Sequence, residues 1–409
     1  MTPVGPEARP ARGAWPIVFL GFTALALTFS GRALLSLIVP ELEQEFGWTR
    51  GFIANTGALA LVVMAIVAPL AGRLIDIRGL RVTLITGLAL IAVGSALLTV
   101  TDNPWVFVFC FGLVCGAGFG FVATHVVATA VAHAFVRNTG VPTGIATSGA
   151  TAGQFFILPL LAAIMTALTW RWSFGGLALA SLALIPFAWF LTAGLVAPDR
   201  RSDGGPSSIG SDLRFLVTSR AFHILFWSFF ICGYTTSGVI ENHFLPYASF
   251  CGFAPLVGAS AYGVLSVVNF AGMITSGWLT DRMNRPLLLG TIYILRALTF
   301  LILINVGTDV EILFAFAIAF GVVDFATIPV TASLAVSHLG LRVMGLAMGL
   351  IVGGHQFGGA LGAFLGGYLF DLYAHYEWLW LSSIAVAAAG GLLVYTMRDH
   401  PATPRLAAA

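Results

Sequence analysis

The ten residues GRLIDIRGLR, at positions 72–81, follow an apolar stretch and recur in altered form as GWLTDRMNRP at positions 277–286. Both copies have glycine at their first position and aspartate at their fifth, and each follows an apolar segment of similar length. Self-similarity at a long, fixed offset indicates repeated structural units. The chain is therefore predicted to consist of two halves with the same order of elements.

The composition shows which solvent surrounds these halves. The 409 residues include 58% hydrophobic and only 9% charged side chains, with a mean hydropathy of +0.96, whereas a soluble domain carries about 25% charge. So much apolar surface cannot be hidden in a core of ordinary proportions, so lipid must cover most of it. The composition predicts a polytopic membrane protein and argues against a soluble enzyme.

The charged residues exclude further classes of protein. All 19 basic residues are arginine, so the lysine chemistry of Schiff bases and P-loops is ruled out. A net charge of +2, without a basic domain, argues against nucleic acid as a partner. The four cysteines lack metal-ligand spacing and are interpreted as small hydrophobic side chains. We expect no metal and no cofactor.

Polar interruptions divide the chain into twelve apolar stretches, each long enough to cross a bilayer as a helix of about 20 residues. We place them at residues 15–39, 52–74, 82–101, 104–132, 139–167, 173–196, 221–246, 257–280, 286–306, 310–335, 343–369 and 377–397. Fifteen of the 19 arginines fall on the side that holds both termini, and only Arg50 and Arg171 fall opposite. The positive-inside rule therefore predicts a cell inner-membrane protein with both termini in the cytoplasm.

The longest polar segment, PDRRSDGGPSSIGSD at residues 198–212, separates six spans from six. Its glycine, serine and proline content is typical of a linker. We predict an all-α polytopic membrane protein with an N-terminal six-helix bundle at 1–197, a cytoplasmic linker at 198–214 and a C-terminal six-helix bundle at 215–409. Two repeated six-helix halves are typical of secondary transporters, whose substrate site lies between the halves near the midplane.

The repeated decapeptide resembles the marker Gly-x-Leu-x-Asp-Arg-x-Gly-Arg-Arg of the major facilitator superfamily, found between helices two and three and more weakly between helices eight and nine. The resemblance implies a twelve-helix transporter that works by alternating access, and we expect a monomer. A carboxylate at a helix end can hold the facing bundle through an arginine or an orphaned helix terminus; the alternative is that the flanking arginines serve topology alone. The residues expected to form this cytoplasmic gate are Gly72, Asp76, Arg81, Gly277, Asp281 and Arg285.

The outer end of the first span, EFGWTR at residues 45–50, is similar to the branch that contains monocarboxylate transporters and oxalate:formate exchangers. That resemblance implies a small organic anion as substrate. The arginine that this branch commonly carries in helix eight is Met273 here, with Asn269 one turn earlier. The anion must then be met by another cation.

Ionisable residues inside the membrane are costly and are functional candidates by default. Arg32, in the first span, can clamp a carboxylate in two-pronged fashion, or form an outer-gate ion pair with Glu241 of the seventh span. Glu241 is a candidate proton carrier or a solvated cap. Arg296 and Asp324 lie centrally in the ninth and tenth spans, where they form either a structural bridge or functional groups that hold the anion and move a proton.

Mid-helix polar residues complete the candidate site. Gln154 and Gln356 occupy one half each, and His355 either couples a proton to transport or makes an interhelical hydrogen bond. The residues expected to contact substrate are Arg32, Arg296, Asn269, Gln154, Gln356 and His355, and those expected to carry a proton are Asp324 and Glu241.

These residues predict a secondary transporter for a small organic anion, a monocarboxylate by resemblance, with the co-transport of a proton left open. The alternative is a proton-driven exporter of drugs or metabolites with the same fold, because a membrane-embedded acid also suits cation efflux. A membrane enzyme or receptor is disfavoured, since no Walker motif, metal cluster or nucleophile elbow appears in the sequence.

Overall fold

The structure is a computed structural model that describes residues 14–48, 50–135, 139–192 and 209–399. Helices fill these ranges, and no strand occurs within them. The first group of helices is α1 (Trp15–Leu37), α2 (Val39–Phe46), α3 (Arg50–Leu98), α4 (Pro104–Phe107), η1 (Val108–Cys115), α5 (Gly116–Phe121), α6 (Thr124–Ala134), α7 (Gly140–Ala167) and α8 (Trp170–Leu191). The second group is α9 (Ile209–Thr218), α10 (Arg220–Gly233), η2 (Tyr234–Ile240), α11 (Glu241–Phe250), α12 (Pro255–Thr280), α13 (Arg285–Ile304), α14 (Val310–Val323), α15 (Thr327–Leu339), η3 (Leu341–Val343), α16 (Met344–Tyr373) and α17 (Glu377–Tyr395).

These helices cross the molecule twelve times, as expected. Eleven continuous helical segments of the described ranges are long and apolar enough to span a bilayer, and one of them, Asn55–Leu98, has 44 residues. That segment makes two crossings, because Gly79 interrupts α3 with a φ of 81°, a left-handed conformation that glycine adopts without strain. The second decapeptide turns differently: the Asn284 side chain caps α13 by accepting a hydrogen bond from the Leu287 N–H at 2.9 Å.

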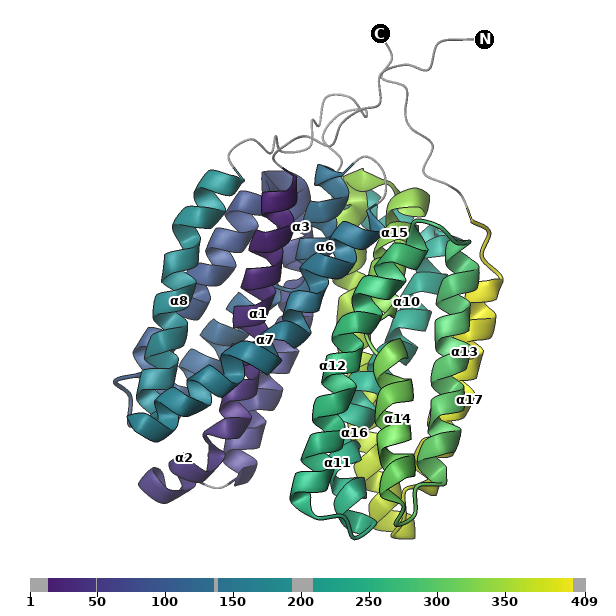
Figure 1. The fold of residues 1–409 in the computed structure, drawn as a ribbon. Coiled ribbons are helices and arrows are strands. Elements are labelled where there is room, and N and C mark those ends of the chain that lie inside the picture. Colours follow the sequence, from purple (N-terminus) through teal and green to yellow (C-terminus); the bar gives the residue numbers. More distant parts are fainter. Residues whose placement is uncertain (1–13, 49, 136–138, 193–208, 400–409) are drawn as a thin grey trace, which may run out of the picture.

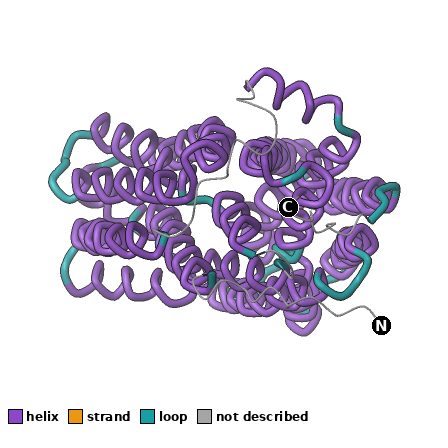
Figure 2. Tube along the Cα trace, turned by 90° about the horizontal axis from the view of Figure 1, so that it is seen from above, coloured by secondary structure: helices purple, strands orange, loops and turns teal. Residues whose placement is uncertain are grey.

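Figure 1 shows the two groups side by side, α1 to α8 in purple to teal and α10 to α17 in teal to yellow. We call the end of the molecule where residues 72–81 and 277–286 lie the motif end. The groups approach each other there, α3 against α16 and α7 against α12. Figure 2 shows the described helices from above, packed together and joined by loops, several of them at the edge of the molecule. The architecture is that of two helical bundles joined at one end.

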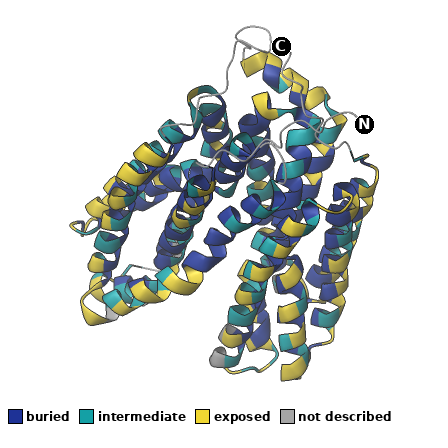
Figure 3. Ribbon diagram, turned by 45° about the horizontal axis from the view of Figure 1, so that its top comes forward, coloured by how far each residue is buried: buried dark blue, intermediate teal, exposed yellow. Residues whose placement is uncertain are grey.

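Large apolar side chains are exposed on the outer faces of the bundles. Phe156 is 70% exposed, Trp172 63% and Leu179 69%, and Figure 3 shows exposed residues running along the outer helices. Such a surface is stable only in contact with hydrocarbon. The chain is therefore a multi-pass membrane protein.

Helix α9 contacts both bundles. Residues 198–208 of the expected linker lie outside the described residues, and the rest of it, from Ile209, already belongs to this helix. The fully buried Asp212 pairs with Arg73 of α3 at 2.5 Å and with Arg342 of η3 at 3.4 Å. Arg73, one of the arginines in the first copy of the repeated motif, therefore makes a specific contact at the motif end.

Two of the twelve crossings are broken near their middle. In the fourth, α5 ends at Phe121 and α6 begins at Thr124, with Val122 and Ala123 in non-helical conformations between them. In the tenth, α14 ends at Val323 and α15 begins at Thr327. Irregular backbone at membrane depth is tolerated where it lines a cavity, and both breaks border the site described next.

Candidate functional site

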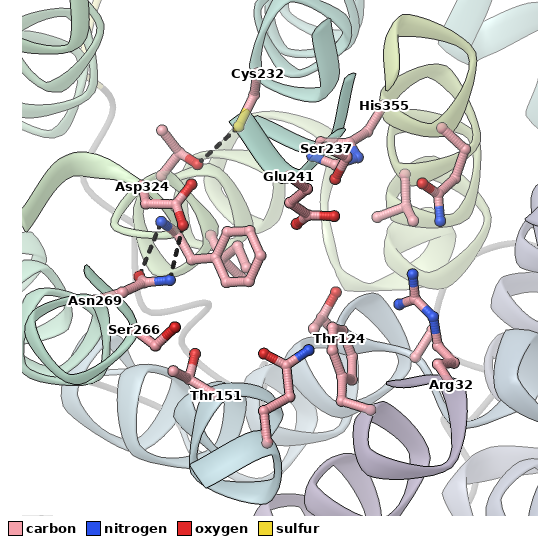
Figure 4. A pocket seen from close by; sticks show the side chains of 18 of the residues that line it. Arg32, Thr124, Thr151, Cys232, Ser237, Glu241, Ser266, Asn269, Asp324 and His355 are labelled. Carbon is pink, nitrogen blue, oxygen red and sulfur yellow. Dashed lines mark hydrogen bonds between the residues drawn. The ribbon is translucent and has the colours of Figure 1, made fainter. Parts of the chain in front are cut away.

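A cavity of about 100 Å³ lies between the two bundles. Side chains from α1, α3, α5, α6 and α7 form one wall, and side chains from α10, η2, α11, α12, α15 and α16 form the other, together with the break in the tenth crossing (Figure 4). Seven of the eight residues predicted to contact substrate or carry a proton line it: Arg32, Gln154, Glu241, Asn269, Asp324, His355 and Gln356. Residues scattered over 300 positions of sequence therefore meet in one space.

Arg32 is presented to the cavity by α1. Its guanidinium carbon lies 4.8 Å from the centre of the Phe29 ring, and its side chain is half-buried. Within the described ranges, none of the salt bridges within 4.0 Å includes Arg32, so the anticipated pair with Glu241 is not formed in this conformation. Glu241 lines the same cavity and is exposed. Arg32 is thus a cation with unused donors in a largely apolar setting.

Arg296 is placed behind the cavity wall and does not line it. The side chain is fully buried, with the guanidinium over the Tyr293 ring. Its Nη2 donates to the carbonyl oxygens of Val323, at 2.6 Å, and Asp324. These carbonyls end α14 and would otherwise lack partners, so the arginine serves as a C-cap. Of the two alternatives left open by the sequence, the bridge to the Asp324 carboxylate is replaced by bonds to backbone because the helix breaks at that residue, and the contact of Arg296 with the cavity is not made.

The Asp324 carboxylate is oriented by Asn269. Asp324 is 7% exposed, and its Oδ2 accepts a hydrogen bond from Asn269 Nδ2 at 2.9 Å. Asn269 Oδ1 in turn accepts from the N–H of Phe325 at 3.1 Å, which fixes the amide. The other carboxylate oxygen, Oδ1, has no hydrogen-bond partner among the described residues. Asn269 therefore positions Asp324, which leaves only one of its amide hydrogens for a substrate.

The polar side chains of α16 and α7 lie on opposite walls. His355 Nε2 lies 3.5 Å from the hydroxyl of Thr236, and its ring is 5.0 Å from that of Phe229, so it makes an interhelical contact at the edge of the cavity. Gln154 is exposed to the cavity and Gln356 half-exposed. Both amides are free to offer donors and acceptors to a polar ligand.

Two residues that line the cavity were not predicted from the sequence. Cys232, interpreted as a small hydrophobe, lines the cavity and accepts a hydrogen bond from Arg296 Nη1 at 3.1 Å. Thr124 lines it as the first residue of α6, whose N-cap residue, Ala123, provides no side-chain cap. A helix beginning inside a cavity directs N–H groups and a partial positive charge at it. Neither feature could be seen in sequence, because no proline or charged residue lies at the break before Thr124, and Cys232 becomes polar only through the arginine brought against it.

At the motif end, each gate aspartate caps a helix of the opposite bundle. The carboxylate of Asp76 accepts hydrogen bonds from the N–H groups of Gly345, at 2.8 Å, and Leu346, at 2.9 Å, at the start of α16. Asp281 accepts from Gly140, at 2.9 Å, and Val141, at 3.1 Å, at the start of α7. The repeat therefore produces two related contacts, and the orphaned helix terminus is the partner in both.

The gate glycines allow the backbones to touch. A Cβ on Gly72 would collide with the carbonyl oxygen of Gly345, and one on Gly277 with that of Gly140.

The gate arginines are placed differently, because each bonds within its own half. Arg81 donates to Thr192 at 3.3 Å, and Arg285 pairs with Asp399 at 2.6 Å. The inter-bundle contact thus rests on the glycines and aspartates.

These features define the class of protein: a twelve-span helical transporter with a central cavity between two repeated bundles. The sequence matches the profile of the Major Facilitator Superfamily over residues 21–352 and 276–409, and the chain belongs to that superfamily. It is a transporter of small molecules and not an enzyme. Within the described ranges, no group of three or more His, Cys, Asp or Glu side chains could hold a metal ion.

Similar proteins agree with this assignment. The chain is 25% identical over 397 residues to monocarboxylate transporter 13 of Bos taurus, covering 96% of this chain and 91% of the relative. It is 24% identical over 372 residues to the uncharacterized MFS-type transporter YcxA of Bacillus subtilis (strain 168), covering 88% and 89%. Among solved structures, the outward conformation of the transporter FucP aligns with a TM-score of 0.76 at 17% identity, over 95% of this chain and 100% of that one. The proton:xylose symporter XylE aligns at 0.73 and 13%, over 94% and 95%. These structural likenesses establish the fold alone.

Proposed function

We propose that this protein is a secondary active transporter of a small organic anion, with a monocarboxylate as the expected class. The single observation that carries the proposal is Arg32, a guanidinium that faces the cavity without an ion-pair partner among the described residues. Arginine binds a carboxylate through two parallel hydrogen bonds, which is strongest where water is scarce. The names of the curated relatives, several of them monocarboxylate transporters, support the same class.

Two further features support an anion. The uncapped start of α6 lies in the same wall as Arg32 and adds backbone N–H groups to the site. The cavity, at about 100 Å³, suits a molecule of a few heavy atoms.

Charge balance connects the anion to a proton. Around the cavity, Arg32 and Arg296 offset Glu241 and Asp324, so the site is neutral when all four groups are ionised. A monocarboxylate adds one negative charge, and an uncompensated charge inside the membrane is costly. Protonation of Asp324 or Glu241 restores neutrality. We therefore infer that a plain monocarboxylate moves with one proton.

The proposed direction of opening follows from the contacts at the motif end. If the termini and the arginine-rich loops are cytoplasmic, as the positive-inside rule predicts, the two aspartate caps close the cytoplasmic side. The conformation described would then face outward. Alternating access requires these caps to release when the substrate is delivered inside.

The proton-driven exporter remains a second candidate, for one specific reason. Because Arg296 lies behind the wall, the described lining has two acids, Glu241 and Asp324, against one arginine. That balance also suits an organic cation.

The test uses purified protein in detergent, with thermal unfolding measured against short-chain carboxylates and against tetraphenylphosphonium. A ligand present at 100 times its Kd adds about 2.7 kcal/mol, which raises the Tm visibly. We expect a carboxylate to stabilise the parent, and Arg32→Ala to remove that response. Arg282→Ala is the matched control, because Arg282 lies at the motif end over Trp278, outside the cavity. Stabilisation by the cation alone, or an unchanged carboxylate response in Arg32→Ala, would overturn the proposal.

A further inference from the structure

The motif end includes a contact from outside the twelve spans. Helix α9 precedes the second bundle, and the Oδ2 atom of its buried Asp212 lies 2.5 Å from Nη1 of Arg73 in α3. The other oxygen, Oδ1, lies 3.4 Å from Nη2 of Arg342 in η3. By contrast, the salt bridges of Arg171 and Arg285 each stay within one bundle. One carboxylate therefore joins an arginine of the first bundle to an arginine of the second.

Helix α9 is attached to the second bundle by apolar packing. Leu216 is fully buried in a core cluster that includes Phe222 of α10, and Leu213 packs against the same cluster. The ring Nε2 of His223 in α10 donates a hydrogen bond to the carbonyl oxygen of Val217 at 2.7 Å, which fixes the corner between the two helices. Helix α9 must then move with the second bundle. The bond that breaks when the bundles part is the one to the arginine of α3.

Helix α3 presents two charges to the second bundle, one helical turn apart. Asp76 accepts the N–H groups at the start of α16, and Arg73, three residues earlier on the same face, meets Asp212. In the second copy of the repeat, the position that corresponds to Arg73 is Trp278. The contact of α3 with α16 is thus reinforced by an ion pair that the related contact of α12 with α7 cannot make from the corresponding position.

Burial ties this ion pair to the closed motif end. A buried charge is tolerated where it is paired, and the loss of one partner leaves the other charge buried and uncompensated. While α3 is in place, each oxygen of Asp212 faces an arginine. When α3 withdraws, water reaches the carboxylate and replaces Arg73. The balance between the closed and the open motif end therefore depends on whether both charges are present.

We propose that α9 is a clasp, carried by the second bundle, that closes on the first bundle through the pair of Arg73 with Asp212 and must release before the motif end can open. The segment between the two bundles is then part of the gate. A contact outside both the spans and the cavity thereby sets the balance between two conformations, whichever substrate the protein carries.

The experiment measures the distance between spin labels at the motif end in purified full-length protein. The labels replace the exposed residues Arg78 of α3 and Arg282, which follows α12, in a background without the half-exposed Cys251. Opening of the motif end converts short distances into long ones. The variants are Arg73→Gln, Asp212→Asn and the double variant that carries both changes.

We expect Arg73→Gln to raise the ratio of long to short distances about tenfold, because Asp212 then stays buried in the closed form with only its more distant partner. Asp212→Asn should act in the same direction but less strongly, since the Arg73 side chain is 15% exposed and reaches water. The double variant leaves no lone buried charge, yet it should stay about threefold above the parent because the attraction between the bundles is lost.

Arg342→Gln is the matched control. It removes the same charge from the same carboxylate, but Arg342 and α9 both belong to the second bundle, so their contact persists when the motif end opens. The ratio of long to short distances should therefore stay within about twofold of the parent.

A double variant with the distance distribution of the parent would overturn the inference, because the pair would then hold nothing together. An equal shift in Arg342→Gln and Arg73→Gln would also overturn it, since α9 would not be a part of the second bundle that docks on the first. If Asp212→Asn fails to fold, Arg73→Gln still decides, because an unchanged distribution in that variant refutes the clasp. Each of these outcomes leaves the proposed function standing, since that proposal is tested by ligand binding to the cavity.

Discussion

Adding one methyl group at Gly277 should open the motif end. The Cβ of an alanine there would lie well within 3.0 Å of the carbonyl oxygen of Gly140, closer than Cβ atoms approach other heavy atoms in real structures. It would also lie 3.3 Å from the Cα of Gly144 in α7. Because backbone atoms cannot rotate away, α12 and α7 must separate by about 1 Å to reach ordinary contact distances. Overpacking of this kind costs about 1–3 kcal/mol.

That cost applies to one conformation only. When the motif end opens, α7 and α12 part and the methyl group meets no neighbour. The equilibrium between the two conformations should then shift toward the open motif end by about 5- to 150-fold. The higher helix propensity of alanine, about 1 kcal/mol, acts in both conformations and cancels.

Gly263→Ala is the matched control, because Gly263 lies in the same helix and a Cβ there has nothing within 4 Å. Gly72→Ala should reproduce the effect of Gly277→Ala through the related contact with Gly345. Agreement between the two would show that both copies of the repeat hold the same closure.

Distances between spin labels report the shift. One pair replaces the exposed residues Arg78 and Arg282 at the motif end, and the other replaces Gln44 and Thr308 at the opposite end, in a background without the half-exposed Cys251. Gly277→Ala should lengthen the first distance and shorten the second. Distributions identical to those of Gly263→Ala, in protein that remains folded, would refute the assignment of this glycine to the closure.

Three further outcomes follow from the hydrogen bonds of the structure. Asp76→Ala removes the cap of two N–H groups at the start of α16 and should weaken the closed motif end by about 1–2 kcal/mol, read as a longer distance between the labels there. Asp76→Asn keeps one acceptor oxygen and should retain part of the cap; a loss equal to that of Asp76→Ala would contradict this, because the amide oxygen would then contribute nothing. Arg296→Leu leaves the end of α14 uncapped and should lower the free energy of unfolding by about 1–3 kcal/mol for each carbonyl oxygen left without a donor, so a total loss below about 1 kcal/mol in thermal or denaturant unfolding would show that the cap is dispensable. Asn269→Leu removes both bonds that orient Asp324 and leaves that buried carboxyl group without its donor, so it should lower the free energy of unfolding by about 1–3 kcal/mol; unchanged stability in thermal or denaturant unfolding would contradict its role as a positioning residue.

Several site residues could be found without coordinates. Charges and amides in the middle of spans are costly in hydrocarbon, so each one stands out, and Arg32, Glu241, Asp324, Gln154 and Gln356 do line one cavity. The two aspartates of the repeat could also be predicted to contact a helix end of the facing bundle. The unpaired N–H groups at the start of a helix need an acceptor, and each aspartate supplies its carboxylate to such a helix start. Charged and amide side chains inside the spans can be recognised as functional candidates from the sequence, because few positions in a membrane tolerate them.

Arg296 shows where such inference stops. Because Arg296 is a charged residue inside a span, the sequence predicted that it contacts substrate, as it did for Arg32. In the structure, Arg296 is instead buried against the carbonyl oxygens of Val323 and Asp324. The difference depends on the break between α14 and α15, which creates the unpaired carbonyls, and on the rotation of α13 that turns the arginine toward them. Cys232 was missed for the same reason, because its polar role comes from the arginine brought against it.

The sequence by itself determined that this protein spans the membrane twelve times, that its halves repeat and that a few named polar side chains must face one another, since apolar length and the cost of buried charge are properties of composition and spacing. Only the tertiary structure decided which arginine faces the cavity, which oxygen of Asp324 is left without a partner and how closely the glycines bring α7 to α12. Those outcomes depend on helix rotation, on helix breaks and on contacts between residues hundreds of positions apart, which local sequence does not encode.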